Sequence, residues 1–233
     1  KFIAKKQAQE SASSGSKSGS LPTVTNKKGD PISYQRAESG KSYVDTLQTA
    51  KQTVKKYCAD NDMPDKSWRV DVHEADDYDK NTHTYQTDGG SCFGISQVTD
   101  DHHTKGDIVS VCANMDNGDR GSDLMKMAVA NGGDRLDSFD GNHGFYTRCG
   151  FEPVSWVKFD DEYAPEEWKA LNPGFKPGMP DKDLRVPRED VIFYRYTGKK
   201  STESADVFKK RVAASASYDE AKDTRNAAMD KGE

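Results

Sequence analysis

The sequence has no long apolar run and few hydrophobic residues overall. Of its 233 residues, 33% are hydrophobic and 31% are charged. No stretch approaches the roughly 18 consecutive apolar residues that a membrane-spanning helix requires. A composition this polar supports only a lean core, so we expect one domain of ordinary size with solvated tails rather than two small domains.

Cysteine is sparse and scattered. Cys58, Cys92, Cys112 and Cys149 form no C-x-x-C pair that would indicate zinc and no dense framework typical of a small secreted protein. We therefore expect reduced thiols and a cytoplasmic protein. The N-terminal KFIAKK lacks both a methionine and the apolar segment of a signal peptide, which indicates a processed chain or an excised piece of a longer one.

Positive charge is concentrated at one end of the chain. Residues 1–40 contain seven Lys or Arg and three Asp or Glu, which leaves the remainder with a net charge of about −9. An acidic body does not favour a phosphate backbone as the main partner, because neutralising phosphates requires clustered Lys and Arg. The basic arm is either a solvated tail or a segment that contacts nucleic acid or an acidic protein surface.

Composition and periodicity divide the chain. Residues 11–20, SASSGSKSGS, cannot bury enough apolar surface to offset their ordering entropy. From Lys41 to about Asp60, apolar residues recur at three- and four-residue steps, which predicts an amphipathic helix. The predicted organisation is a flexible basic tail (1–40), an N-terminal helix (41–65), a main domain (66–198) and a charged helical extension (199–233).

The main domain changes between strand and helix patterns. WRVDVHE (68–74), SCFGISQV (91–98) and GDIVSVCAN (106–114) predict three strands. GSDLMKMAVANGG then returns to helical spacing, and DRLDSF (134–139) is again strand-like, which predicts a βαβ unit. The remaining predicted elements are a short helix in NHGFYTRC, strands in FEPVSWVKF and DVIFYRY, a helix around Pro165 to Leu171, and helical structure over 203–231.

This order of elements, together with the motif F-Y-x-x-x-G-F in GFYTRCGF, resembles the GNAT superfamily of N-acetyltransferases over roughly residues 66–197. The segments RGSDLMKMAVANGGDRLDSF, GFYTRCGFEPVSW, DEYAPEEW and VIFYRYTG are similar to GNAT-like proteins of bacteriophages and bacterial mobile elements. The resemblance implies an α/β (α+β) fold of the acyl-CoA N-acyltransferase type, with a mixed, mostly antiparallel central sheet flanked by helices and with flexible or helical terminal extensions.

The resemblance also implies acetyl-coenzyme A as co-substrate, with no metal. A helix N-terminus presents unpaired N–H groups and the positive end of the helix dipole, and a glycine there lets a pyrophosphate approach. Gly121 takes this place, flanked by Arg120 and Ser122. The preceding strand, through Val109 and Val111, would present main-chain groups to the pantetheine arm.

The loop before this helix departs from the family pattern Q/R-x-x-G-x-G/A. With Gly121 at the last position, Asp119 stands at the earlier glycine and Asp116 at the Gln or Arg. Two carboxylates are unfavourable beside a phosphate. Either Asn117-Gly118 forms a tight turn that directs them outward, or coenzyme binding is weak or lost.

By resemblance, Tyr146 would contact the coenzyme and protonate its departing thiolate. An unperturbed phenol pKa near 10 is a reasonable match for a thiol pKa of about 8.5. The alternative is a half-buried core aromatic. Candidate general bases are Asp137, Asp140 and His143, which lie on or just beyond the strand that would end near the sulfur; each is otherwise a loop or surface residue.

Other polar clusters have two interpretations. His73, Glu74 and the acidic run 76–79 either line an amine-binding cleft or form a solvated loop. Asp100, Asp101, His102 and His103 are metal-ligating residue types. Adjacent side chains point apart in a strand, however, so we expect no metal there.

The sequence therefore predicts an acetyl-coenzyme A-dependent N-acetyltransferase that transfers an acetyl group directly to an amine, on a small molecule or a protein lysine, in the bacterial cytoplasm. The strands at 106–113 and 134–139 are expected to splay apart where the coenzyme enters. The alternative is a GNAT-shaped module without turnover that serves as a binding or structural part of a phage particle, in contact with phage structural proteins. A membrane partner is not expected and nucleic acid is disfavoured.

Overall fold

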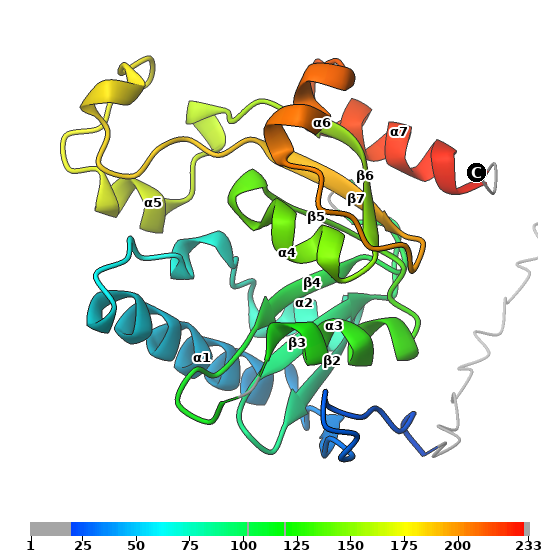
Figure 1. The fold of residues 1–233 in the computed structure, drawn as a ribbon. Helices are drawn as coiled ribbons and strands as arrows, with labels where there is room; N and C mark the ends of the chain where they lie inside the picture. The colour runs from blue at the N-terminus through cyan, green and yellow to red at the C-terminus, as the bar shows by residue number, and fades with distance from the viewer. Residues whose placement is uncertain (1–19, 102, 119, 231–233) are drawn as a thin grey trace, which may run out of the picture.

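The computed structural model describes residues 20–101, 103–118 and 120–230, which form two antiparallel sheets and the helices that cover them (Figure 1). The first sheet has the strand order β1-β2-β3-β4 and the second has the order β5-β7-β6. The strands are β1 (Tyr34–Arg36), β2 (Thr82–Thr87), β3 (Cys92–Ser96), β4 (Ile108–Cys112), β5 (Arg135–Phe139), β6 (Phe151–Val157) and β7 (Val191–Tyr196). A mixed α/β chain with antiparallel sheets is thereby confirmed.

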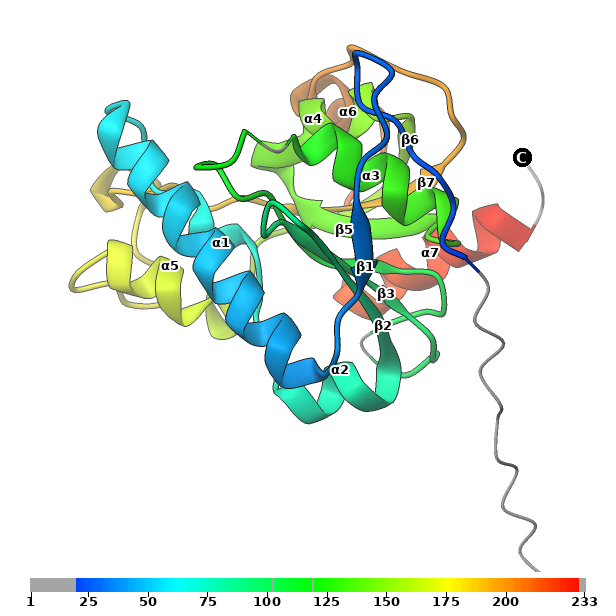
Figure 2. The same cartoon turned by 90° about the horizontal axis from the view of Figure 1, so that it is seen from below.

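Helices cover both faces of each sheet. The described α-helices are α1 (Gly40–Asp60), α2 (Ala75–Asn81), α3 (Gly121–Ala130), α4 (His143–Arg148), α5 (Glu166–Leu171), α6 (Ala205–Arg211) and α7 (Tyr218–Asp230). Short 3-10 turns lie at Ser67–Arg69, Asp140–Asn142, Asp161–Tyr163 and Asp181–Asp183. Helices α1 and α2 pack on one face of the first sheet and α3 on the other, while α4 and α7 lie on opposite faces of the second sheet (Figures 1 and 2).

Helix α1 forms where its periodicity predicts it. The Ser39 hydroxyl caps its N-terminus by accepting from the Ser42 N–H at 3.1 Å, which satisfies one of the amides that the first turn leaves unpaired. The three- and four-residue spacing places Tyr43, Leu47 and Ala50 on one buried face. This face packs against the first sheet and forms a core of its own with Tyr78, Cys92 and Cys112.

The chain enters the fold before the predicted boundary at residue 40. Val24 is only 8% exposed, and β1 pairs antiparallel with β2, with Gln35 opposite Gln86. The part of the predicted tail that the structure describes, residues 20–40, therefore lies against the first sheet. Residues 1–19, which include most of the Ser/Gly-rich stretch, are outside the described residues.

The predicted strand at 68–74 is wrong. This segment begins with a 3-10 turn at Ser67–Arg69 and pairs with no strand in the described structure. Both edges of β2 are taken by β1 and β3, and Val70 and Val72 pack against the apolar cluster that contains Tyr43. Trp68 instead packs in a separate apolar cluster with Trp168 of α5, against which Phe139 and Phe159 also pack.

The other predicted strands and helices of the main domain form close to their expected positions, and α6 and α7 give the helical structure predicted after residue 203. Strand β7 lies between β5 and β6, so its side chains alternate between two environments. Ile192 and Tyr194 join the core that α3 shares, whereas Phe193 contacts Tyr218 of α7 with 4.8 Å between ring centroids. The C-terminal extension thus covers the second sheet.

Gly150 ends α4 in a conformation that other residues rarely adopt. Its φ is +93°, and an added Cβ would lie 3.0 Å from the Cα of Gly198. Gly132, just after α3, has a similar φ of +97° but open space around it. A comparison of substitutions at the two glycines therefore separates the effect of backbone strain from the effect of close packing.

We expect Gly150→Ala to lower the free energy of unfolding by about 2–3 kcal/mol, because it adds steric crowding to a strain of about 1 kcal/mol or more. Gly132→Ala should cost only the strain, about 1 kcal/mol. Urea denaturation of the two variants and the wild type measures the difference. Equal losses in both variants would contradict the role of the Gly198 contact.

Candidate active-site cleft

A cleft opens where the two sheets part. Strands β4 and β5 approach each other only at a single parallel bridge, between Asp107 and Arg135, and then pair with different neighbours. Beyond this bridge β4 is an edge strand, and edge strands leave a row of backbone N–H and C=O groups available. The separation predicted between residues 106–113 and 134–139 is present.

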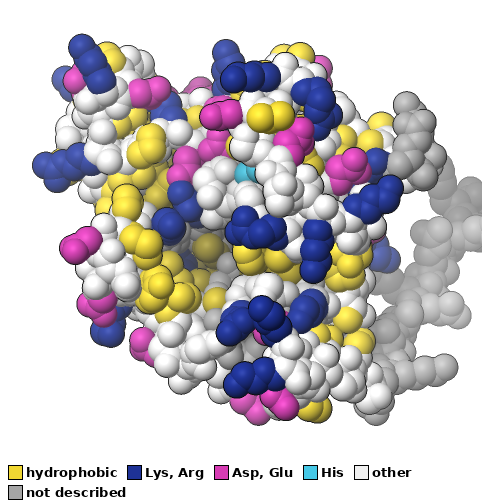
Figure 3. All heavy atoms as spheres, in the orientation of Figure 1, with side chains coloured by type: hydrophobic (Ala, Val, Ile, Leu, Met, Phe, Trp, Pro, Cys, Tyr) yellow, Lys and Arg dark blue, Asp and Glu magenta, His cyan; other side chains and the backbone are white. Residues whose placement is uncertain are grey.

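The cleft has a volume of about 1660 Å³ and is bordered by β4, β5, α4, α7 and the segments around residues 71 and 160. Figure 3 shows the face of Figure 1 hollowed near its middle, with hydrophobic side chains to one side and Lys and Arg side chains over α3 and α4 on the other. Val109, Val111, Asp137 and Tyr146, four of the residues predicted for the site, line this cleft together.

Strand β4 is bulged within the cleft. Cys92 pairs with Cys112 but Gly94 pairs with Val109, so β4 contains one extra residue over this stretch. Ser110 takes up the irregularity with a φ of +50°. Hydrogen bonds with α1, with α2 and with the segment before α2 hold this uncommon conformation.

Two tyrosines secure Ser110. The Tyr43 hydroxyl donates to the Ser110 carbonyl at 2.9 Å, and the Tyr78 and Ser110 hydroxyls are 2.8 Å apart. The Ser110 hydroxyl also donates to the carbonyl of Asp71 at 3.1 Å. Helices α1 and α2 therefore fix the shape of the strand along which the pantetheine arm was predicted to lie.

Tyr146 stands on α4, with its side chain partly accessible from the cleft. Its ring packs against Phe145, Phe151 and Tyr194, with centroid distances of 5.0, 6.3 and 5.6 Å. Burial raises the pKa of Tyr146 to about 12, and the charge of Asp137 acts in the same direction, while a hydrogen bond with Ser138 lowers it. The phenol keeps its proton at neutral pH and is a donor there.

Asp137 faces the same cleft from β5. Burial raises the pKa of its carboxyl to about 6, with a further upward contribution from Asp107 and opposing ones from Arg225 and a hydrogen bond with Tyr218. At neutral pH the group is ionised but accepts a proton more readily than an ordinary Asp. Of the predicted general bases, Asp137 has the position and the pKa suited to the role.

His143 does not lie in the cleft. Its side chain is 2% exposed, with Nε2 3.0 Å from the carbonyl of Glu203 and Nδ1 3.1 Å from the Tyr194 hydroxyl. Because a carbonyl only accepts, Nε2 carries the proton and Nδ1 accepts from Tyr194. Burial lowers the pKa of His143, so it is a neutral core residue with both ring nitrogens engaged. Asp140, the third candidate, pairs with Lys209 at 2.5 Å.

The predicted pyrophosphate site at the start of α3 lies beside α4. Gly121 is the first residue of α3, and Arg120 precedes it without a side-chain capping bond. A Cβ at Gly121 would lie 3.0 Å from the ring of Phe145, so the missing side chain allows the two helices to approach. Arg120, Gly121 and Ser122 are outside the lining of the cleft described above.

The loop before α3 contains the turn predicted at Asn117-Gly118. Residues 115–118 form a turn in which Gly118 has a φ of +71°. Asn117 donates to the carbonyl of Gly89 at 2.7 Å, which ties the loop to the β2–β3 connection. Asp116 is exposed and acts on Lys56 of α1, so its carboxylate is directed toward that helix. Asp119 is outside the described residues.

Positive charges gather near Cys149 at the end of α4. Burial raises the pKa of the Cys149 thiol, while the charges of Arg148, Lys200 and Lys126 lower it. These cations come from α4, the segment after β7 and α3.

The charged groups that line the cleft are mainly acidic. Its Asp side chains are Asp71, Asp77, Asp100, Asp101, Asp137, Asp160, Asp161 and Asp219, and its Lys and Arg side chains are Arg69, Lys158 and Arg188. Arg69 pairs with Glu189, Arg188 pairs with Asp161 at 2.6 Å, and Asp219 pairs with Lys222 at 3.7 Å, so most of the charge left in the cleft is negative. The cleft therefore favours a positively charged ligand.

Part of the predicted amine-binding lining is present. His73, Asp77 and Tyr78 border the cleft, whereas Asp79 accepts from the N–H of Gly40 at 2.6 Å and belongs to the contact between α1 and α2. Of the possible metal ligands, His102 is outside the described residues. Among the residues that are described, no group of three His, Cys, Asp or Glu side chains is arranged to hold a metal ion.

Two residues of the cleft escaped the sequence analysis. Ser110 was assigned only to a strand, because no local signal marks a bulge there. Tyr218 was placed in a charged terminal helix, although it lines the cleft and interacts with Asp137. Both depend on contacts between segments far apart in the sequence.

Replacing the buried carboxylate should stabilise the protein. Because the pKa of Asp137 is raised in the folded state, stability falls as pH rises from about 4 through about 6. We expect Asp137→Asn to increase the free energy of unfolding at pH 7 by up to about 3 kcal/mol, with the gain vanishing near pH 4.

Urea denaturation at pH 4 and pH 7 measures this gain. Asp116→Asn is a matched control, because Asp116 is exposed in a turn and its replacement should leave stability nearly unchanged at both values. An Asp137→Asn variant no more stable than the wild type at pH 7 would contradict the assigned environment.

The comparisons with known proteins give no relatives for this chain: no family model matches it, and no curated protein or solved structure matches it significantly. In the described part of the chain, none of the helices is both long and apolar enough to cross a membrane.

Proposed function

We propose that the protein is a GNAT-type N-acetyltransferase that transfers an acetyl group from acetyl-coenzyme A to an amine. The observation that carries the proposal is the parting of β4 from β5 beside α4, with Tyr146 and Asp137 both lining the opening. An acidic acceptor cleft on one side and a cationic surface over α3 and α4 on the other supply two compartments of suitable charge.

The chain offers a plausible path for an extended thioester. Val109 and Val111 lie on the exposed edge of β4, where backbone groups are available for the amides of a pantetheine arm. Arg148, Lys126 and Lys200 surround Cys149 at the end of α4, and their charges suit the phosphates. The ring of Phe145 occupies the space next to Gly121, so the contribution of that glycine to phosphate binding stays a prediction.

Acetyl-coenzyme A would supply a thioester whose carbonyl carbon is attacked by an uncharged amine. Asp137, ionised at pH 7, takes a proton from the arriving ammonium group and so generates that amine. Tyr146 donates toward the sulfur when the C–S bond breaks. The nitrogen loses a second proton when the amide forms, and the thiol gains one. The net products are therefore an amide, a thiol and one proton.

The pKa of Tyr146 modifies the role predicted for it. At about 12, rather than near 10, the phenol is a weaker acid than a thiol of pKa about 8.5. Its first contribution is therefore a hydrogen bond that stabilises the developing thiolate. At pH 7 the released thiolate, whose thiol has a pKa of about 8.5, then takes up a proton from water.

The acceptor class follows from charge. The cleft presents carboxylates on several segments, including Asp71, Asp101 and Asp219. A protonated amine on a small molecule or on a lysine side chain is attracted to such a surface. Within the proposal, the enzyme works in the cytoplasm of a bacterial host, and phage association is the alternative setting.

Binding of acetyl-coenzyme A is the first test. Ligand at 100 times its dissociation constant should add about 2.7 kcal/mol of stability, which raises the melting temperature by about 5 to 10 °C in a chain of this size. Thermal denaturation with acetyl-coenzyme A, and with ADP as a control that lacks the pantetheine arm, measures it.

Absence of a shift at millimolar acetyl-coenzyme A would favour the alternative, a GNAT-shaped binding or structural module without turnover. One observation supports that alternative, namely the Phe145 ring against Gly121 where a phosphate was expected. An equal shift with ADP would indicate a nucleotide site that does not extend into the cleft.

Tyr146→Phe tests the donor. It keeps the ring packing and removes the hydroxyl, so we expect kcat to fall about tenfold or more while the affinity for acetyl-coenzyme A is retained. A coupled thiol-release assay with an amine panel provides the rates. Tyr57→Phe is the control, because Tyr57 is 43% exposed on α1 and does not border the cleft. Equal rates in the Tyr146→Phe variant and the wild type would assign Tyr146 to packing.

A further inference from the structure

Helix α7 is held firmly against the second sheet. The buried hydroxyl of Ser155, in β6, donates to the carbonyl of Ala221 at 2.6 Å. Arg195 of β7 donates to the carbonyl of Ala228 at 3.0 Å, near the other end of the helix. Just before α7, Ser215 bridges to Val157 of β6. The helix is thus anchored to both neighbouring strands.

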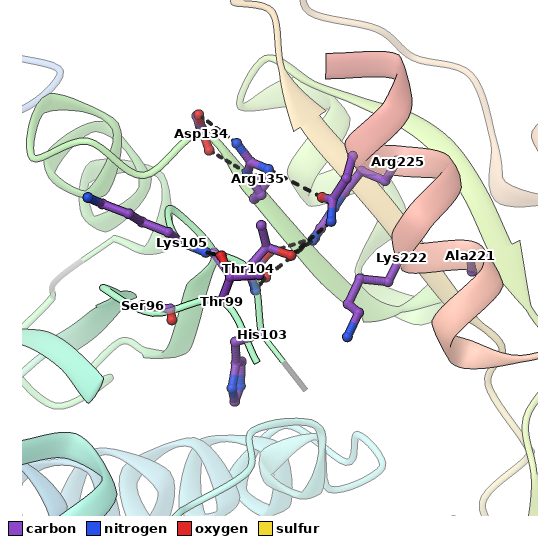
Figure 4. A network of polar contacts seen from close by, with 12 residues as sticks. Ser96, Thr99, His103, Thr104, Lys105, Asp134, Arg135, Ala221, Lys222 and Arg225 are labelled. Carbon is purple, nitrogen blue, oxygen red and sulfur yellow. Dashed lines mark hydrogen bonds and ion pairs between the residues drawn. The ribbon is translucent and has the colours of Figure 1, made fainter. Parts of the chain in front are cut away.

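Arg225 fixes α7 at the point where the two sheets meet. Its fully buried guanidinium donates to both carboxylate oxygens of Asp107, at 2.6 and 3.2 Å, and lies over the ring of Phe193. Asp107 is the residue whose bridge to Arg135 joins the sheets. Figure 4 shows Arg225 directed from α7 toward Thr104, to whose hydroxyl it donates at 3.5 Å.

The same helix contacts the loop before β4. Lys222, with 7% of its surface exposed, donates to the carbonyls of Asp100, at 3.3 Å, and Asp101. Asn226 donates to the Thr104 hydroxyl at 2.9 Å. These bonds connect α7 to the loop before β4, and the bonds described above connect it to the second sheet. Together they fix the position of its first residue relative to β5.

That first residue is Tyr218. Its ring packs on Phe193 of β7, which lies opposite Asp137 in the pairing of β5 with β7, so its hydroxyl and the Asp137 carboxyl are close enough to interact. Burial raises the pKa of Tyr218 well above its ordinary value, so its hydroxyl remains a donor at any working pH. Tyr218 is 36% exposed and lines the cleft beside Asp137.

Charged and titratable groups face Asp137 from several elements. Asp107, just before β4, and Asp71, before α2, disfavour its ionised form. Arg225 of α7 favours that form, although its guanidinium is bonded to Asp107. Tyr146 of α4 is also close enough to interact with the carboxylate. The hydroxyl of Tyr218 is thus a protonated group that can donate to Asp137.

We propose that Tyr218 is a positioning residue for Asp137, holding one oxygen of the carboxylate so that the other receives the proton of the acceptor amine. The catalytic meaning of this contact rests on the proposed acetyltransfer. The contact itself makes the C-terminal extension a part of the active site, although it follows the last strand of the sheet.

Tyr218→Phe tests the inference, because it preserves the ring on Phe193 and removes the donor. The pKa of Asp137 is followed by carboxyl carbon NMR in the full chain, and the Asp137 signal is identified by its absence from Asp137→Asn. We expect Tyr218→Phe to raise the pKa of Asp137 by about one unit, because a hydrogen bond to an ionised group is lost. Tyr57→Phe, at an exposed position of α1, should leave the pKa of Asp137 unchanged.

Activity gives the second measurement. If the inference is correct, the acidic limb of the pH profile of kcat/KM moves upward by the same one unit or so, which a purely structural loss would not produce. An unchanged pKa of Asp137 in Tyr218→Phe overturns the inference. If Tyr218→Phe raises the pKa of Asp137 but the wild type shows no acetyl transfer, the Tyr218 contact is supported and the proposed function is overturned.

Discussion

The structure depends on the buried ion pair between Arg225 and Asp107. The two sheets meet at the bridge between Asp107 and Arg135 and share one apolar core, so this junction helps to set the geometry of the cleft. A buried carboxylate without a partner is costly, and removing one member of such a pair typically costs about 3–5 kcal/mol. Arg225 therefore stabilises the junction and at the same time fixes the helix that borders the cleft.

Much of the fold was predictable from local patterns, because apolar spacing and turn residues act over short distances. Helix α1 and strand β7 formed where periodicity placed them, and Gly150 ended α4 as expected. The segment 68–74 has the alternation of a strand but no neighbour to pair with, since β1 takes the edge of β2. A segment becomes a β-strand only when it pairs with another strand, and its own sequence does not show whether such a partner is available.

The candidate site was predictable in part. Tyr146 and Asp137 were identified from the motif and the strand order, and both line the cleft. His143 was also a reasonable candidate by titration range, but its environment depends on Tyr194 and Glu203, which lie far along the chain. Tyr218 had no local signal at all, because its meaning arises only when α7 packs beside β5.

The junction also has a consequence for synthesis of the chain. Asp107 and Arg225 are 118 residues apart in sequence. At about 5–20 residues per second, a ribosome needs roughly 6 to 24 s to make that interval. During this time the first sheet can assemble, but the carboxylate of Asp107 stays hydrated and α7 does not yet border the cleft. The nascent chain therefore cannot complete the cleft until translation has passed α7.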